Sequence, residues 1–149
     1  MQEFIIRKAT KQDIAAIYNM VYELAVFEKE PEALKIGIKD YEEAFSEKLF
    51  DSIVAELDGK IIGIALFYMT FSTWRGKCLY LEDFYVKPEF RKMGVGQKLF
   101  DGYIAEAKSK GTKQAKWQVL DWNDVGLNFY IRNNAIIEKN WWNGKLYFD

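Results

Sequence analysis

The spacing of apolar residues in the first part of the chain predicts one strand and two helices. Residues 4–8 form a short run of strand-forming residues, and the apolar residues after them follow helical spacing: Ile14, Ile17, Tyr18, Val21 and Leu24. Thr10 and Asp13 resemble a capping box at the start of this helix. A second helix is expected over residues 40–49, with Asp40 as its N-cap.

Two strands follow, and the residues between them predict a tight hairpin. Residues 52–57 and 60–70 are rich in β-branched and aromatic side chains, and Asp58-Gly59 is typical of a type I′ turn. A connection at residues 71–76 leads to a third strand at residues 79–86. Because these strands are consecutive and joined by short turns, we expect this part of the sheet to be antiparallel.

A bend rich in glycine separates the strand at residues 79–86 from the next helix. Pro88 ends the strand, and a helical face then extends to Gly111 through Leu99, Phe100, Tyr103, Ile104 and Ala107. A strand at residues 115–120 is reached through this crossover helix, so we expect it to lie parallel to strand 79–86. A short helix around Tyr130 and a terminal hairpin at residues 136–148 follow.

Together these elements predict a mixed α/β fold in a single domain that spans residues 1–149. Helices flank a sheet that is mostly antiparallel and contains one central parallel pair. The length and the 50% content of hydrophobic residues are sufficient for one packed core.

The bend at residues 91–96 combines features that suit an anion. Gly94 and Gly96 lack a Cβ atom, so a phosphate group can approach the main chain closely where a helix begins. Arg91 and Lys92 add positive charge at the same place. The pattern is neither a P-loop, because no Gly-Lys-Ser/Thr follows, nor a dinucleotide fingerprint, because the third glycine is absent. It predicts either a site for a phosphate or pyrophosphate, or a capped helix after a turn.

Composition narrows the classes of partner and chemistry. The net charge of −1 argues against nucleic acid as the main partner. The sequence contains no histidine, which removes the commonest general base and metal ligand, and no metal site is expected. The single cysteine, Cys78, and the lack of a signal peptide or long apolar span predict a soluble cytoplasmic protein that does not bind membranes.

Several motifs occur in an order that resembles the GNAT superfamily of acyl-CoA-dependent N-acyltransferases. Arg91-x-x-Gly94-x-Gly96 resembles the pyrophosphate loop of that family. Within the superfamily the chain is most similar to the spermidine/spermine and thialysine acetyltransferases. The residues that carry this likeness are Ile6-Arg7-x-Ala9-Thr10, Glu23-Leu24-Ala25 with Glu28, Trp74-x-Gly76-Lys77, Leu79-Tyr80-Leu81-Glu82-Asp83-Phe84, and Trp122-Asn123 with Asn128-Phe129-Tyr130.

The resemblance implies acetyl-CoA as the co-substrate and no metal. The residues implied to bind acetyl-CoA are Phe84, Tyr85, Val86, Arg91, Lys92, Met93, Gly94, Val95, Gly96, Gln97, Asn123, Asp124, Gly126 and Tyr130. Main-chain amides near Phe84 and Tyr85 would contact the thioester oxygen and the pantetheine arm, and residues 92–97 would hold the pyrophosphate. Asn123 would hydrogen-bond the pantetheine arm, although capping of a helix alone would explain an asparagine there.

The resemblance also implies direct attack of an amine on the thioester, with Glu82 and Tyr130 as catalytic residues. Glu82 matches the base of related enzymes, and Tyr130 matches the acid that protonates the departing thiolate. A primary amine is mostly protonated near neutral pH, and without histidine a carboxylate is the natural acceptor of its proton. The alternatives are an ion-paired strand carboxylate for Glu82 and a phenol packed in the core for Tyr130.

The implied acceptor is a small cationic amine. The residues that match the amine channel of polyamine-type enzymes are Phe27, Glu28, Trp74 and Asp83. Ser72 stands where those enzymes tend to carry an acid, which weakens the case for spermidine itself. The acidic residues of segment 26–32 fit either a solvated surface or a rim that attracts a cation.

We therefore expect an N-acetyltransferase that transfers acetyl from acetyl-CoA to a primary amine of a polyamine, a diamine or a thialysine-like amino acid. A homodimer is expected by analogy with the family. Two alternatives stay open. One is an acetyltransferase for protein or peptide amines, and the other is a regulatory module that binds CoA without catalysis. The presence of both Glu82 and Tyr130 argues against the second.

Overall fold

The computed structural model describes residues 3–148 of the chain, which divide into two compact units between Gln118 and Val119. The helices and strands of the first unit are β1 (Ile5–Lys8), α1 (Ile14–Phe27), α2 (Ile38–Ser46), β2 (Asp51–Leu57), β3 (Lys60–Ser72), β4 (Gly76–Val86), α3 (Val95–Ser109) and β5 (Gln114–Trp117). Single turns of 3₁₀ helix lie at Lys11–Asp13, Pro31–Ala33 and Pro88–Phe90. The second unit contains α4 (Asp124–Arg132).

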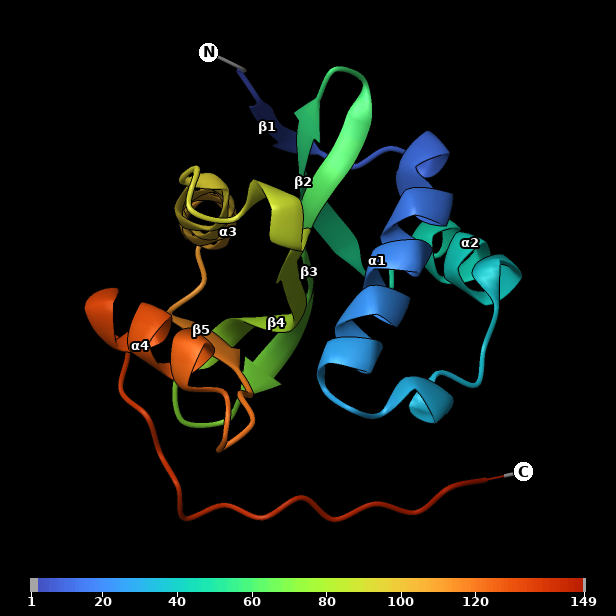
Figure 1. Ribbon diagram of the computed structural model, residues 1–149. Helices are drawn as coiled ribbons and strands as arrows, with labels where there is room; N and C mark the ends of the chain where they lie inside the picture. The colour runs from blue at the N-terminus through green and yellow to red at the C-terminus, as the bar shows by residue number, and fades with distance from the viewer. Residues whose placement is uncertain (1–2, 149) are drawn as a thin grey trace. The chain divides into compact units, whose positions relative to one another are not determined.

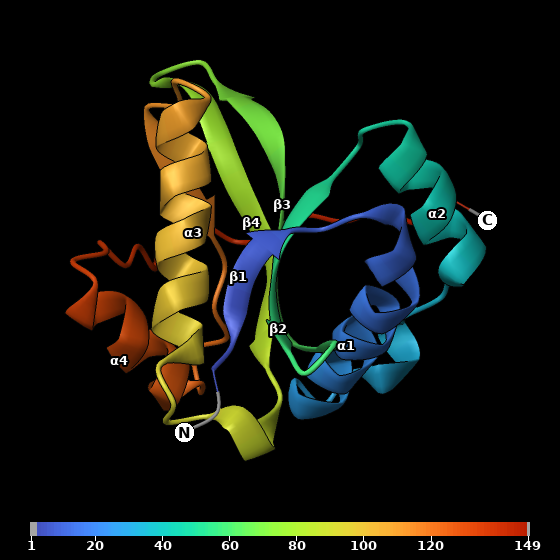
Figure 2. The same ribbon diagram turned by 90° about the horizontal axis from the view of Figure 1, so that it is seen from above.

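The five strands form one mixed sheet in the order β1-β2-β3-β4-β5. Neighbours from β1 to β4 are antiparallel, and β5 lies parallel to β4. Within the first unit, α1 and α2 cover one face of the sheet and α3 covers the other (Figures 1 and 2). The predicted fold class, a mostly antiparallel sheet with one parallel pair and flanking helices, is confirmed.

The core of the first unit lies on both faces of β2, β3 and β4. On the α1 side, Ile14, Ile17 and Met20 pack against Leu66 and Tyr85. On the α3 side, Gly63 allows close approach of the helix, because a Cβ atom there would lie 2.8 Å from Leu99 Cδ1 and 3.2 Å from the Tyr85 carbonyl oxygen. The glycine thus sets how closely α3 packs against β3.

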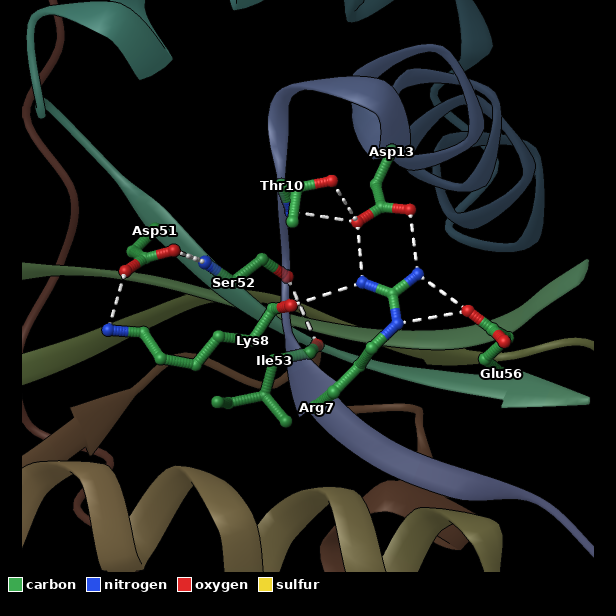
Figure 3. Close-up of polar contacts among 8 residues, drawn as sticks. All are labelled: Arg7, Lys8, Thr10, Asp13, Asp51, Ser52, Ile53 and Glu56. Carbon is green, nitrogen blue, oxygen red and sulfur yellow. Dashed lines mark hydrogen bonds and ion pairs between the residues drawn. The ribbon is translucent and has the colours of Figure 1, made fainter. Parts of the chain in front are cut away.

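An ion cluster joins the first strand to the elements around it. Figure 3 shows the Arg7 guanidinium between two carboxylates, those of Asp13 and Glu56, with N–O distances of 2.7 to 2.9 Å. The Asp13 carboxylate also accepts the main-chain N–H of Thr10 at 2.8 Å. The predicted capping contact between Thr10 and Asp13 is therefore present, and it belongs to a larger cluster that ties β1, the first helical segment and β2 together.

Local turn chemistry agrees with the sequence at the first hairpin. Asp58 and Gly59 both adopt positive φ angles, 50° and 76°, as a type I′ turn between β2 and β3 requires. The next connection is shorter than expected, because β3 continues to Ser72 and β4 begins at Gly76. The Ser72 hydroxyl oxygen accepts the N–H groups of Trp74 and Arg75 and stabilises this second turn.

Three predicted boundaries are wrong. Helix α2 begins at Ile38 rather than at Asp40, because Asp40 occupies its third position and accepts the N–H of the N-cap Gly37 at 2.9 Å. Helix α1 continues to Phe27, two residues into segment 26–32, which the acidic residues and Pro31 predict to be a loop. Strand β5 ends at Trp117 rather than near residue 120, because its pairing with β4 stops at Leu81.

The predicted terminal hairpin is also wrong. Residues 136–148 contain no strand, and several large apolar side chains there are strongly exposed: Ile136, Trp141, Trp142, Leu146, Tyr147 and Phe148. The strand-like composition of this segment alone does not make a hairpin, because an isolated two-stranded ribbon is marginal in water. Within residues 3–148, no helix is long and apolar enough to cross a membrane.

Candidate active site

A β-bulge in β4 changes which face of the sheet its side chains occupy. Leu66 of β3 stands opposite Asp83, whereas the next residue, Phe67, stands opposite Leu81. Glu82 is therefore the extra residue of the bulge. Because side chains alternate along a strand, this one additional residue shifts the alternation of β4 between its two halves.

The bulge brings two consecutive carboxylates to the α1 side of the sheet. Asp83 shares the face of its partner Leu66, which packs beneath α1. Glu82 also reaches this side, because its carboxylate accepts a hydrogen bond of 2.8 Å from the hydroxyl of Tyr68, two residues after Leu66 on β3. Within residues 3–148 Glu82 makes no ion pair with a lysine or arginine. The alternative interpretation of Glu82 as an ion-paired strand carboxylate therefore does not match the structure.

A third carboxylate, that of Glu28 directly after α1, contributes to the same negative region. Burial and the charges of Glu82 and Glu28 raise the pKa of Asp83 to about 7. Burial and the nearby Glu82 also raise the pKa of Glu28. Tyr41 of α2 lies near these carboxylates. Burial raises the pKa of its phenol, and so, to a smaller extent, does the charge of Asp83. Neighbouring carboxylates disfavour one another's negative charge, so a bound cation would stabilise their ionised forms.

The main-chain edge of β4 is open beside these carboxylates. Within residues 3–148, strand β5 pairs with β4 only from Cys78 to Leu81, and no strand pairs with that side of β4 from Glu82 to Val86. The peptide groups of a strand without a neighbour are available to an extended ligand. The residues on this edge include Phe84, Tyr85 and Val86, which were expected to contact the cofactor.

Arg91 anchors the beginning of the glycine loop to the end of β4. Its Nε donates a hydrogen bond of 3.0 Å to the carbonyl oxygen of Val86. Its guanidinium lies 5.4 Å from the centroid of the Tyr85 ring and 5.8 Å from that of Phe27. The charge of Arg91 is therefore placed by contacts with β4 and with the last residue of α1.

Residues 92–97 comprise the end of the glycine loop and the first residues of α3. Lys92 and Gly94 adopt positive φ angles of 69° and 82°, and α3 begins at Val95. Left-handed residues next to a helix start turn successive N–H groups toward one point, and the first turn of a helix has N–H groups without intrahelical acceptors. Met93 and Gly96 complete the loop, and a Cβ atom at Gly96 would meet no atom closer than 3.9 Å.

In the second unit, Asn123 caps α4. Its side-chain oxygen accepts the N–H of Gly126 at 3.1 Å, and a Cβ atom at Gly126 would lie 2.7 Å from the Asn123 amide nitrogen. Asp124 is the first residue of the helix, where a carboxylate favours the helix dipole. Tyr130 is buried within α4, and its ring packs edge-on against that of Phe129 at 5.5 Å.

Trp74 lies apart from the carboxylates in the first unit. It occupies the turn between β3 and β4, where its side chain is 86% exposed. From Gly76, the first residue of β4, six residues lead to Glu82, a path of about 20 Å along an extended strand. The structure therefore brings Glu28, Glu82 and Asp83 together and leaves Trp74 at the far end of the hairpin.

A comparison with protein families now decides the class of protein. The model described as the acetyltransferase (GNAT) family matches residues 13–134, well over half of the chain. The chain belongs to the acetyltransferase (GNAT) family. The resemblance inferred from the motifs is thereby confirmed.

Individual proteins show the same relationship. Thialysine N-epsilon-acetyltransferase of Sus scrofa is 36% identical over 140 residues, which cover 87% of this chain and 82% of that protein. Spermidine/spermine N(1)-acetyltransferase-like protein 1 of Homo sapiens is 30% identical over 145 residues, covering 91% of this chain and 21% of that protein. The solved structure of aminoglycoside N-acetyltransferase AAC(6')-Iy in complex with CoA has the same fold, with a TM-score of 0.79, 20% identity and coverage of 97% and 96%. This GNAT protein is therefore an N-acetyltransferase.

The tyrosines around the carboxylates of this acetyltransferase were not predicted from the sequence. Tyr68 donates to Glu82, and the phenol of Tyr80 has a pKa raised by burial and by the charge of Glu82. The alternation of aromatic residues along β3 was the available signal, but it does not reveal the register with β4. Among residues 3–148, no three His, Cys, Asp or Glu side chains are arranged to hold a metal ion.

Proposed function

We propose that this acetyltransferase transfers the acetyl group of acetyl-CoA to a primary amine of a small cationic molecule, by direct attack of the amine on the thioester. The observation that carries the proposal is the segment of β4 from Glu82 to Val86. This segment has an open main-chain edge on one side, carboxylates on one face and the glycine loop directly after it. A thioester arm, a cationic acceptor and a pyrophosphate would each find a complementary surface within the first unit.

The loop after β4 supports acetyl-CoA as the acetyl donor. A pyrophosphate carries negative charge and several acceptor oxygens, which suit converging N–H groups and a helix start. We assign this role to residues 92–97, with Arg91 supplying charge from its anchored position. Main-chain groups of Phe84, Tyr85 and Val86 would bind the pantetheine arm and the thioester oxygen. Asn123, Asp124 and Gly126 at the start of α4 would complete the cofactor contacts.

Two residues would move the protons of the reaction. The acceptor arrives as an ammonium ion, and Glu82 takes one proton so that the nitrogen lone pair can attack the thioester carbon. As the C–N bond forms and the C–S bond breaks, the nitrogen would lose its second proton to solvent. The hydroxyl of Tyr130 would donate a proton to the departing thiolate and regain one from solvent. The products are the amide, free CoA thiol and one proton.

The acidic cluster supports a small polycation as acceptor. Glu28 and Asp83 lie on the α1 side with Glu82 and would bind a second amino group, with Phe27 near the same end of α1. Thialysine, spermidine and spermine, which occur in the names of the relatives, all carry more than one amino group. We therefore propose polyamines, diamines and thialysine-like amino acids as the acceptor class, with Trp74 contacting a longer substrate.

The proposal includes a homodimer in the cytoplasm and one domain from residue 1 to 149. The exposed aromatic residues of segment 136–148 support self-association, since a large apolar surface is costly to leave in water. Light scattering on the purified chain checks this point directly. A monomer at high protein concentration would contradict the dimer without affecting the assignment of the reaction.

The test of the reaction is release of free thiol from acetyl-CoA across a panel of amines. The panel contains spermidine, short diamines, lysine, thialysine, a monoamine of matched length and peptides with free N-termini. We expect turnover with the small polycations and far less with the monoamine, because only the former engage two carboxylates. Turnover with peptides alone would favour a protein acceptor. Thermal stabilisation by acetyl-CoA without any turnover would favour a regulatory module.

A further inference from the structure

A tyrosine on β3 holds the carboxylate that the bulge places on β4. The Tyr68 hydroxyl donates to Oε1 of Glu82 at 2.8 Å, and the two residues are 14 positions apart in the chain. Within residues 3–148 this is the only hydrogen bond or ion pair that Glu82 makes through its side chain. A bulge residue lacks a cross-strand partner to order it, so this one contact determines where the carboxylate lies.

The position of the Tyr68 ring is itself constrained. Tyr80 stands directly opposite Tyr68 across β3 and β4, and the two rings stack with centroids 5.5 Å apart and planes 26° apart. Stacked cross-strand aromatic pairs restrict the side-chain torsions of both residues. Burial and the hydrogen bond to Glu82 raise the pKa of the Tyr68 phenol well above its ordinary range. The hydroxyl therefore keeps its proton, and remains a hydrogen-bond donor, at any pH at which an enzyme of this kind works.

We propose that Tyr68 is a positioning residue for catalysis: its hydroxyl fixes one oxygen of Glu82, so that the other oxygen is free to face the proton of the acceptor. The inference rests on the proposed role of Glu82 as the base. Tyr68 acts through Glu82 and does not itself exchange a proton with the substrate. A hydrogen bond to the charged form of a carboxylate favours that form, and here it opposes the neighbouring negative charges.

The titratable groups near Glu82 come from every element packed against it. They are Glu28 just after α1, Tyr41 of α2, Tyr68 of β3, and Tyr80 and Asp83 of β4. An ionised carboxylate has no proton to donate, so Glu28 and Asp83 in that form cannot replace the Tyr68 hydroxyl. The structure places the Tyr68 hydroxyl on Glu82 as its hydrogen-bond donor. Removal of this donor should therefore leave the base more easily protonated.

The decisive variant is Tyr68→Phe, which keeps the ring and its stacking. We expect the rising limb of the pH profile of kcat, measured at saturating amine, to move upward by about one pH unit, because a hydrogen bond to a charged group is worth roughly that much. At a pH on the rising limb kcat should fall by up to about tenfold, and it should recover at pH values above the limb. Acetyl-CoA binding should not change. The same amine is used throughout, so that its own titration is constant.

Two controls separate positioning from folding. Tyr18→Phe removes a phenolic hydrogen bond of the same length, from Tyr18 to the carbonyl oxygen of Ile36, and should leave the limb in place. Glu82→Asp shortens the side chain so that it no longer reaches Tyr68, and adding Tyr68→Phe should then shift the limb no further. An unmoved limb in Tyr68→Phe, or equal and additive shifts in the double variant, would overturn the positioning role.

The same series distinguishes failure of the inference from failure of the proposed function. If Glu82→Gln abolishes the rising limb while Tyr68→Phe leaves it unmoved, Glu82 is the base and Tyr68 does not position it. If Glu82→Gln retains the limb, Glu82 is not the base, and the role of Tyr68 fails with it. If Tyr68→Phe lowers the rate by the same factor at every pH and lowers the melting temperature, Tyr68 is structural only.

Discussion

Asp13 accepts hydrogen bonds from both terminal nitrogens of Arg7, at 2.8 and 2.9 Å, while it also accepts the N–H of Thr10. Its side chain is only 9% exposed. The hydrogen bonds from Arg7, the largest cause, lower the pKa of Asp13 and raise that of Arg7. A nearly buried carboxylate of this kind depends on its partner, and it connects the first strand to the first helix.

Loss of Arg7 should destabilise the protein. Arg7→Met leaves the Asp13 carboxylate buried without its partner, and we expect a loss of about 2 kcal/mol in the free energy of unfolding, measured by urea denaturation. Lys8→Met is the matched control, because the pairs of Lys8 with Asp51 and Glu106 are long, at 3.4 Å, and its side chain is 55% exposed. The control should change stability by less than about 0.5 kcal/mol. Equal losses in both variants would contradict a special role for the Arg7 cluster.

Asp83 should make stability fall as pH rises toward neutrality. Its folded-state pKa of about 7 lies above the ordinary value of 3.8, so the folded protein retains a proton that the unfolded chain releases. The free energy of unfolding should therefore decrease from roughly pH 4 to about 7 and level off above that. Urea midpoints of wild type and Asp83→Asn across this range test the effect. Asp83→Asn should flatten the dependence, whereas Asp121→Asn, at an exposed position, should not.

The same titration should appear in substrate binding. A cationic acceptor binds better to ionised Asp83, so its KM should fall as pH is raised from 6 to 8, and this fall should disappear in Asp83→Asn. Acetyl-CoA binding serves as the internal control, because its proposed contacts lie in the glycine loop. A KM that remains pH-dependent in the variant would assign the titration to another group.

Tyr130→Phe should separate catalysis from binding. The proton of the phenol is needed only when the thiolate leaves, so we expect kcat to fall about a hundredfold with little change in acetyl-CoA affinity. Tyr22→Phe, at a half-exposed position on α1, is the control. If kcat and acetyl-CoA affinity fall together, or if the melting temperature drops sharply, then the buried phenol is a packing residue.

Substitution of Gly94 and of Gly96 by alanine should change the stability of the protein in opposite directions. Gly94 has a φ of 82°, so Gly94→Ala should cost about 1 kcal/mol of stability. Gly96 lies within α3 with room for a Cβ atom, so Gly96→Ala should stabilise the protein by up to about 1 kcal/mol. A phosphate that approaches the main chain at Gly96 would nevertheless be displaced by the methyl group. Calorimetry should show weaker acetyl-CoA binding despite higher stability, and unchanged binding would argue against contact at Gly96.

The parts of the fold that depend on residues close together along the chain were predictable from the sequence. The type I′ turn at Asp58-Gly59 needs only the positive φ angles that these residues adopt. The parallel pairing of β4 and β5 follows from the crossover helix between them. The start of α2 was misplaced because Asp40 fits either the N-cap or the third position, and only the contact with Gly37 decides.

The arrangement of the candidate site was less accessible, because it depends on strand register. Glu82 and Asp83 are adjacent in the chain, and an ordinary strand would place them on opposite faces. The bulge that brings them together arises from the pairing with Leu66 and Phe67, and no local sequence pattern in β4 predicts it. The contact between Tyr68 and Glu82 has the same origin. Family resemblance identified the residues, and the register explains their proximity.

The bulge also shifts, by one residue, the alternation of β4 side chains between the two faces of the sheet. Before it, Tyr80 faces the α1 side, and after it Tyr85 does, although an uninterrupted strand would send residues five apart to opposite faces. Removal of Glu82 would leave Leu81 next to Asp83, and these two residues already lie on opposite faces, opposite Phe67 and Leu66. The ladder would then be regular, and every other side chain of β4 would keep its face. The insertion therefore adds a second carboxylate to the α1 side without exchanging any residue of the hydrophobic core.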